Sequence, residues 1–193
     1  MNEKIFDVIT YGRSSIDLYS QAVGARFEDI PGFHAFVGGS PLNIAVGCSR
    51  LGLSASLLSG VGKDKVGDFI LNFLKNENVR IENVRVIEGT RSSAVILGIE
   101  PPDRFPLVYY RDNCADSQIN IDQVLNAGIE KSRLLEVSGT ALNIEPTRSA
   151  AFLAAEIARK NEIPVVLDLD FRADQWHDIR AFGVTTRAFM RNV

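Results

Sequence analysis

Residues 37–52 read Val-Gly-Gly-Ser-Pro-Leu-Asn-Ile-Ala-Val-Gly-Cys-Ser-Arg-Leu-Gly, a glycine pair followed directly by an apolar run with helical spacing. Gly38 and Gly39 permit backbone conformations and close approaches that a Cβ would block. Ser40 is a suitable N-cap and Pro41 suits the first helical position, which predicts a helix that begins here and runs to the next glycine. Free backbone N–H groups at such a helix start suit an anionic or polyhydroxylated small molecule.

Asn43 lies one turn into the predicted helix and can point its amide into the same space. Local chemistry alone also fits an ordinary capped loop-to-helix junction, because short glycine motifs occur in many unrelated proteins. The spacing of residues 38–52, and of the following turn at residues 60–67, matches the first sequence pattern of the ribokinase-like (PfkB) carbohydrate kinases. The chain therefore resembles that family.

The resemblance implies an α/β, ribokinase-like fold, a mostly parallel sheet flanked by helices with a small β-lid. We expect residues 1–193 to be the N-terminal part of a single kinase domain, with the C-terminal part of the domain absent and with lid strands within about 20–39 and 90–112. Apolar runs that alternate with helical patterns also favour βαβ crossovers and a parallel sheet.

The chain is expected to alternate strands and helices, with residues 12–17 as a polar loop and no element after residue 180. Strands are predicted by short apolar or β-branched runs, and helices by apolar residues that recur every three to four positions. The predicted strands are 5–11, 34–37, 55–59, 84–87, 93–99, 107–110, 134–138 and 165–167, and the predicted helices are 40–51, 64–76, a short one within 120–131, and one that starts at residue 145.

The composition indicates an ordinary globular protein. Hydrophobic residues make up 46% of the 193 residues and charged residues 23%, and the formal net charge is −3. Such a balance excludes a disordered chain and offers no basic surface for nucleic acid. Two cysteines and two histidines lack the spacing of a structural zinc site, and no apolar run reaches the length of a transmembrane helix. We expect a cytoplasmic protein with neither nucleic acid nor membrane as a partner.

Asp17 is the first candidate for sugar binding, because an ionised carboxylate accepts two strong hydrogen bonds from a diol. The ordinary alternative is a solvated loop acid. In the family that the chain resembles, an aspartate at the end of the first strand binds sugar hydroxyls, and Asp17 takes that position. The resemblance thus implies a substrate site built by Asp17, Gly38, Gly39, Ser40 and Asn43.

A second candidate group follows the run at 107–110. Arg111 alone fits a solvated charge at a strand end. In the branch of the family that phosphorylates sugar acids such as 2-keto-3-deoxygluconate, a Tyr-Tyr-Arg run contacts the substrate, which implies this role for Tyr109 and Arg111. Arginine offers a planar, two-donor partner for a carboxylate. The extension Arg-Asp-Asn-Cys-Ala-Asp at residues 111–116 resembles more particularly the members that act on 5-dehydro-2-deoxygluconate in inositol breakdown.

A third group, Asp168-Leu169-Asp170-Phe171-Arg172, follows a predicted buried strand. Ligands of open α/β sheets bind beyond the carboxyl ends of strands, and alternation would place Asp168, Asp170 and Arg172 on one face. A local ion-pair cluster is the alternative. Sugar-acid kinases of the family carry a similar Asp-x-Asn-x-Arg run, so the resemblance implies that Arg172 contacts the substrate or stabilises the nucleotide side. Asp170 departs from that pattern, and the two aspartates are secondary candidates.

The resemblance implies transfer of the γ-phosphoryl group of ATP to a terminal sugar-acid hydroxyl, with ATP and Mg²⁺ as cofactors. The family's Gly-Ala-Gly-Asp run, which supplies the catalytic base, and its magnesium-associated Asn-x-x-Glu run do not occur in the sequence. We therefore expect no catalytic residue and no metal ligand in this chain, and no activity from it alone.

Two alternatives remain open. One is a kinase for 2-keto-3-deoxygluconate or another sugar. The other is a non-catalytic module that binds a sugar acid or forms a homodimer through the lid, whose exposed strand edges suit such pairing.

Overall fold

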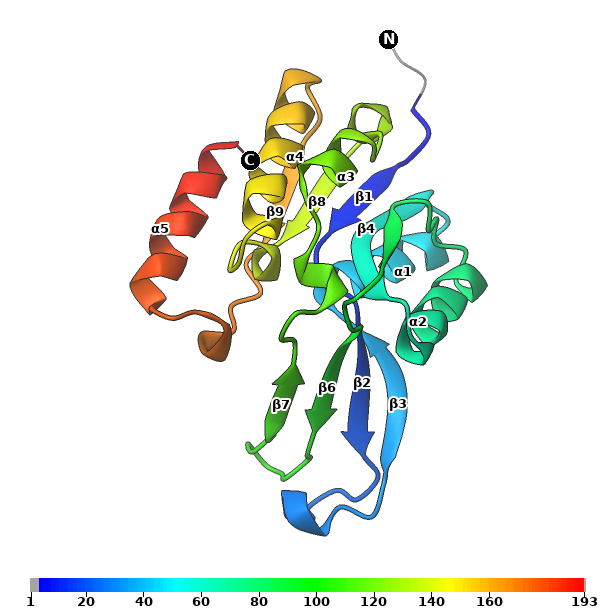
Figure 1. Cartoon of the computed structure of the whole chain (residues 1–193), viewed down its shortest axis with the longest axis vertical. Coiled ribbons are helices and arrows are strands. Elements are labelled where there is room, and N and C mark those ends of the chain that lie inside the picture. The colour runs from blue at the N-terminus through cyan, green and yellow to red at the C-terminus, as the bar shows by residue number, and fades with distance from the viewer. Residues whose placement is uncertain (1–3, 193) are drawn as a thin grey trace.

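The computed structural model describes residues 4–192, whose strands form two sheets joined at one end (Figure 1). The central sheet is parallel throughout and has the order β5-β4-β1-β8-β9, while the second sheet has the order β3-β2-β6-β7. The central strands are β1 (Val8–Tyr11), β4 (Ala55–Gly62), β5 (Val84–Ile87), β8 (Leu135–Ser138) and β9 (Val165–Asp168). The strands of the second sheet are β2 (Ser15–Ser20), β3 (Phe33–Gly38), β6 (Ser93–Leu97) and β7 (Leu107–Tyr110).

Helices cover both faces of the central sheet, as the predicted α/β class requires. One face carries α1 (Ser40–Arg50) and α2 (Lys65–Asn76), and the other carries α3 (Ile121–Leu125) and α4 (Thr147–Lys160). Beside α4 lies α5 (Ile179–Phe189), where the rings of Phe152 and Phe189 meet edge to face at 5.3 Å. None of the helices within residues 4–192 has the length and apolar character needed to cross a membrane.

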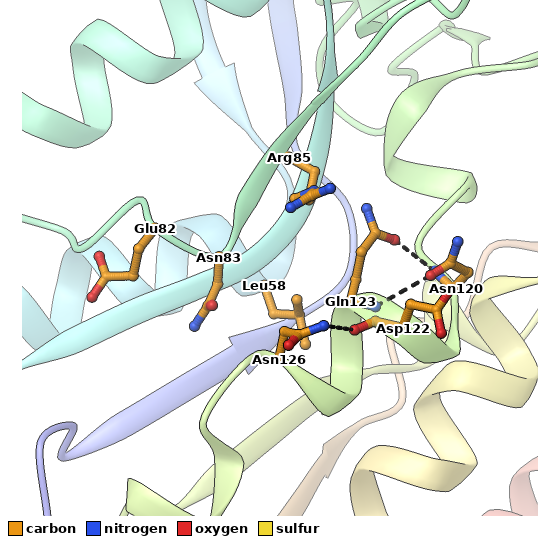
Figure 2. A pocket seen from close by; sticks show the side chains of 8 residues that line it. All are labelled: Leu58, Glu82, Asn83, Arg85, Asn120, Asp122, Gln123 and Asn126. Carbon is orange, nitrogen blue, oxygen red and sulfur yellow. Dashed lines mark hydrogen bonds between the residues drawn. The ribbon is translucent and has the colours of Figure 1, made fainter.

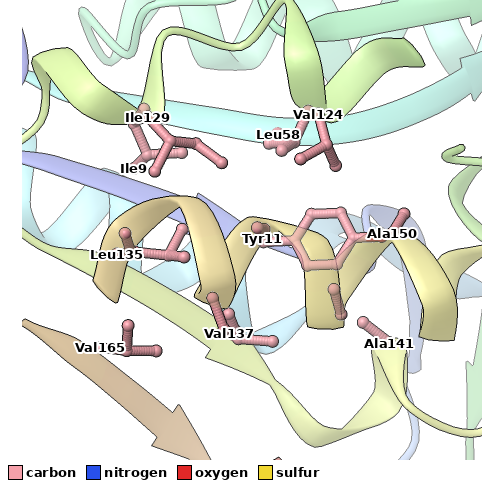
Figure 3. Close-up of a cluster of buried hydrophobic side chains, with 14 of the residues drawn as sticks. Ile9, Tyr11, Leu58, Val124, Ile129, Leu135, Val137, Ala141, Ala150 and Val165 are labelled. Atoms are coloured by element: carbon pink, nitrogen blue, oxygen red, sulfur yellow. The ribbon is translucent and has the colours of Figure 1, made fainter. Parts of the chain in front are cut away.

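Side chains that alternate along β1 separate two apolar cores. Ile9 and Tyr11 face α3 and α4, in the cluster of Figure 3, whereas Val8 faces the cluster below α1 and α2. The Tyr11 hydroxyl is satisfied inside the first core, where it donates a hydrogen bond to the Thr147 carbonyl oxygen at 2.9 Å. These cores make the central sheet a rigid base from which the second sheet, the lid, projects.

The predicted loop at residues 12–17 is wrong over its second half, because Ser15 begins β2. Ile16 and Leu18 alternate with Asp17 and Tyr19, a period-two pattern hidden by polar neighbours, and β2 pairs with β3 on one side and β6 on the other. The lid strand β2 therefore lies almost wholly before the predicted range 20–39, whereas β3, β6 and β7 fall within the predicted ranges.

Two further local predictions are corrected. Gly39, rather than Ser40, precedes the first helical residue of α1, and no side chain within residues 4–192 caps that helix. The Ser40 hydroxyl donates instead to the Asp168 carboxylate. After residue 180, where no element was expected, α5 forms, and it begins with a hydrogen bond from the Arg180 backbone N–H to the Asp178 carboxylate.

Candidate functional site

A cleft of about 520 Å³ opens where the carboxyl ends of β1 and β9 and the glycine turn before α1 meet the lid. Residues far apart in the sequence line it together, because β1 leads directly into β2 and β3 leads directly into α1. The predicted site residues that line it are Asp17, Gly39, Ser40, Asn43, Tyr109, Asp170 and Arg172.

The glycine pair is explained by the close approach of the turn to the β1–β2 connection. Gly39 has a φ of 108°, and a Cβ there would collide with the backbone carbonyl of Arg13. A Cβ on Gly38 would collide with the Asp17 carboxylate. The two glycines therefore make room for the residues at the start of the lid, which places the N-terminus of α1 against the cleft.

Asp17 projects from the middle of β2 and is held in a defined orientation. Ser15 donates a hydrogen bond from Oγ to Asp17 Oδ1 at 2.7 Å. Among the described residues, Oδ2 accepts no hydrogen bond from another side chain, and it remains available for hydroxyl groups of a ligand.

Arg172, Asp170 and Tyr109 form one hydrogen-bonded group at the edge of the cleft. Arg172 Nη2 lies 2.8 Å from Asp170 Oδ1, and Nε donates to the Tyr109 hydroxyl at 3.0 Å. Burial lowers the pKa of Arg172, but Asp170 and Tyr109 outweigh it and raise that pKa above its ordinary value, so the guanidinium stays charged.

The predicted alternation from Asp168 to Arg172 is not observed, because β9 ends at Asp168. Asp170 has a positive φ of 33°, which turns the chain. Asp168 accepts hydrogen bonds from the Ser40 hydroxyl and, at 3.3 Å, from the Asp170 backbone N–H. A turn therefore gathers these charges at the end of the strand, and part of the group is the local ion pair that was the alternative interpretation.

Arg111 is not brought into this cleft. Its Nε pairs with Asp116 Oδ2 at 2.8 Å, and its side chain is only 10% exposed. Nη1 donates to Thr140 O and Gln175 Oε1 at 3.3 and 3.0 Å. Arg111 lines a separate hollow of about 410 Å³, and Tyr109 is the one predicted site residue that lines both spaces.

Arg13 lines the cleft and was missed by the sequence reasoning, which took it as part of a polar loop. The residue is only 6% exposed, and its guanidinium lies 5.3 Å from the centre of the Tyr109 ring. Its position, directly after a buried strand and Gly12, was the available signal, because ligands of parallel sheets bind at that end.

Beneath the charges at the end of β9 lies the buried side chain of Glu136, on β8. It is 3% exposed, and neither carboxylate oxygen has a hydrogen-bond partner among the described residues. Burial, together with the negative charges of Asp168 and Asp170, raises the pKa of Glu136 to about 8. The side chain is therefore largely neutral at physiological pH.

A third hollow, of about 310 Å³, lies between α3 and the start of β5 (Figure 2). The polar groups that α3 and its two ends contribute to this hollow bond one another. Asn120 and Gln123 form a reciprocal capping box, and Asn126 donates from its side chain to the Asp122 carbonyl at 2.7 Å. On that side, the residues that line the hollow serve the local structure of α3.

Comparison with known proteins places these observations in one family. The chain matches the family described as "pfkB family carbohydrate kinase" over residues 6–188. It is 37% identical over 172 residues to 5-dehydro-2-deoxygluconokinase 1 of Bacillus cereus, a match that covers 89% of this chain and 52% of the relative. The chain thus spans about half the length of the curated relatives it matches.

Two solved structures show the same fold. The PfkB protein from Polaromonas sp. JS666 superposes with a TM-score of 0.90 at 23% identity, over 97% of this chain and 64% of that protein. A sugar kinase from Pyrococcus horikoshii, solved in complex with ATP, superposes with a TM-score of 0.85 at 22% identity, over 96% of this chain and 60% of that protein.

Proposed function

The chain belongs to the pfkB family of carbohydrate kinases, and from this premise we propose that the whole protein phosphorylates 5-dehydro-2-deoxygluconate in inositol catabolism, in the cytoplasm. In that reaction a terminal hydroxyl of the sugar acid would form a bond to the γ-phosphorus of ATP and give its proton to a general base, while the bond from that phosphorus to the β-phosphate oxygen would break and release ADP. The observation that carries the proposal is the cleft, in which a carboxylate for hydroxyl groups faces cationic side chains.

In this proposal the described residues bind and orient the sugar acid. Asp17 and Asn43 hydrogen-bond its hydroxyl groups, the glycine turn presents backbone N–H groups, and the lid shields the bound sugar from water. Arg172 supports the anionic ligand through its charge. Ser40, held by Asp168, fixes the wall between the turn and β9.

ATP and Mg²⁺ are the proposed cofactors, and the name of the ATP-bound relative supports the first of them. Within residues 4–192 no group of three or more His, Cys, Asp or Glu side chains is placed to hold a metal ion, so we assign Mg²⁺ no ligand there. The sequence also holds no Gly-Ala-Gly-Asp run. We propose that the 193-residue chain binds the sugar acid but does not phosphorylate it.

Calorimetric titration of the purified chain tests this function. We expect 5-dehydro-2-deoxygluconate to bind more tightly than 2-keto-3-deoxygluconate, and fructose to bind weakly. An ADP-release assay with Mg-ATP and the sugar acid should show no turnover. Equal or tighter binding of fructose would refute the sugar-acid substrate, tighter binding of 2-keto-3-deoxygluconate would favour that alternative, and steady ADP release would refute the proposed inactivity of this chain.

A further inference from the structure

The guanidinium of Arg13 is a buried charge that has no ion-pair partner in the described part of the chain. Its Nε and Nη1 are buried and have no hydrogen-bond partner, and within residues 4–192 no carboxylate forms an ion pair with Arg13. A buried cation with unpaired donors is unfavourable unless an anion or hydrogen-bond acceptor completes it. A ligand bound in the cleft can supply this acceptor, since Arg13 is one of the lining residues.

Two other arginines lie near the cleft. Each nitrogen of the Arg172 guanidinium has a partner, whereas Arg111, whose Nη2 has none among the described residues, does not line the cleft. Arg172 donates from Nε to Tyr109, from Nη1 to the Phe171 carbonyl and from Nη2 to Asp170. Arg111 is neutralised by Asp116 and lines the separate hollow. Among the described residues that line the cleft, Arg13 is thus the cation whose donors remain free for a ligand.

The backbone and the Tyr109 ring hold Arg13 in place before any ligand binds. Its carbonyl oxygen lies 2.3 Å from where a Cβ of Gly39 would be, so the glycine turn packs tightly against this residue. The guanidinium lies 5.3 Å from the centre of the Tyr109 ring, a cation–π contact that leaves the in-plane N–H groups free. A receptor held in this way loses little conformational entropy on binding.

The charge balance of the cleft identifies the anion. Arg13 and Arg172 contribute two positive charges to the lining, and Asp17 and Asp170 contribute two negative ones. A singly charged carboxylate suits one free guanidinium, whereas a doubly charged phosphate would meet both aspartates. We infer that Arg13 binds the carboxylate of the sugar acid and makes the cleft prefer acids to neutral sugars, an inference that rests on the proposed function.

Arg13→Met tests the inference, because it removes the charge and keeps a stem that packs against Tyr109. Calorimetry would compare 5-dehydro-2-deoxygluconate with its neutral carboxamide, whose hydroxyl groups are the same. We expect Arg13→Met to weaken binding of the acid about 10- to 100-fold and binding of the amide less than about threefold. Arg133→Met, an equal change of charge at a residue whose side chain is 67% exposed, should leave both affinities unchanged.

A second measurement keeps the wild-type residue. The ¹⁵N resonance of Arg13 Nε, assigned by its loss in Arg13→Lys, should shift on titration with the acid and stay in place with the amide. Inorganic phosphate should not displace the acid at equal concentration. Arg13→Lys, which keeps the charge and loses the planar fork, should bind the acid with intermediate affinity.

The outcomes separate this inference from the proposed function. Wild-type binding of acid and amide with equal affinity, or equal losses for both in Arg13→Met, would overturn the role of Arg13 and leave a sugar site. Displacement of the acid by equal phosphate would overturn the carboxylate assignment. Failure of the wild-type chain to bind either compound would refute the proposed function itself, and this inference with it.

Discussion

At the scale of single residues, the buried Glu136 makes stability depend on pH. Its pKa of about 8 in the folded chain exceeds the ordinary value of 4.5, so the unfolded chain loses this proton at lower pH than the folded chain does. Stability should therefore fall as pH rises from about 4.5 to about 8 and level off above that range. Near pH 8 the free energy of unfolding should be lower by about 4 kcal/mol than near pH 4.

Glu136→Gln removes the ionisable proton while keeping nearly the same volume. We expect the variant to be more stable than the wild type at pH 7.5 and to lose most of the difference near pH 5, measured by urea unfolding at both pH values. Glu156→Gln, on the exposed face of α4, is the control and should follow the wild type. Identical pH profiles for wild type and Glu136→Gln would show that Glu136 is ionised when folded.

Single residues also show where sequence reasoning ends. The role of the glycine pair was predictable from the sequence, because only glycine fits at these two positions. A Cβ on Gly38 would collide with Asp17, and one on Gly39 would collide with Arg13. The burial of Arg13 could not be predicted in the same way, since the Tyr109 ring that it packs against is far away in the sequence. For the same reason, the predicted substrate contact of Arg111 did not take account of Asp116, which pairs with it in the folded chain.

At the scale of elements, Asp64 links the start of α2 to the segment before β6. Its carboxylate accepts hydrogen bonds from the Gly67 backbone N–H and from the backbone N–H and hydroxyl of Ser92, at 2.8, 2.8 and 2.9 Å. Burial alone would raise the pKa of Asp64, but these bonds outweigh it and lower the pKa below its ordinary value. The stabilisation is thus present at neutral pH and is lost as pH falls through that lowered pKa.

Asp64→Ala should lower the free energy of unfolding by about 1–3 kcal/mol at neutral pH, because it removes the helix cap and the acceptor for the backbone N–H and hydroxyl of Ser92. Asp64→Asn keeps one capping oxygen and should cost less. Urea unfolding at neutral pH measures the loss for both variants, and their m-values should equal that of the wild type. A loss for Asp64→Ala below about 0.5 kcal/mol would contradict a stabilising role for this junction.

Helices and strands were predicted best where the apolar residues follow a single clear period. The strand at 107–110 and the helix that ends at Lys160 agree with β7 and α4, because apolar periodicity is strong in both. β2 was missed because polar residues on its cleft face concealed the alternation. This strand was missed because of the cleft that it lines: a strand that lines a polar cleft carries polar side chains, which are also typical of a loop.

At the scale of the whole molecule, the parallel sheet and its helices were predictable from the alternation of strands and helices, but the outer face of the lid was not. Residues 17, 19, 95, 97, 107 and 109 line the cleft, so alternation turns their neighbours to the opposite face. Apart from Ser20 at the end of β2, that outer face is apolar or aromatic, with Ile16, Leu18, Ala35, Ile96, Val108 and Tyr110. Val108 and Tyr110 are 39% and 57% exposed in the single chain.

An apolar sheet face gains stability when a second layer covers it, and we propose that the lid of a second copy supplies that layer. Light scattering after size exclusion should then give twice the mass of one chain at high concentration. Val108→Lys should give a monomer, because it places a charge in the proposed interface, and its melting temperature should no longer rise with protein concentration. Val86→Lys, at a valine that is 50% exposed on β5 of the central sheet, is the matched control and should remain dimeric. A monomeric wild type would refute lid pairing, and a dimer that survives Val108→Lys would place the interface elsewhere.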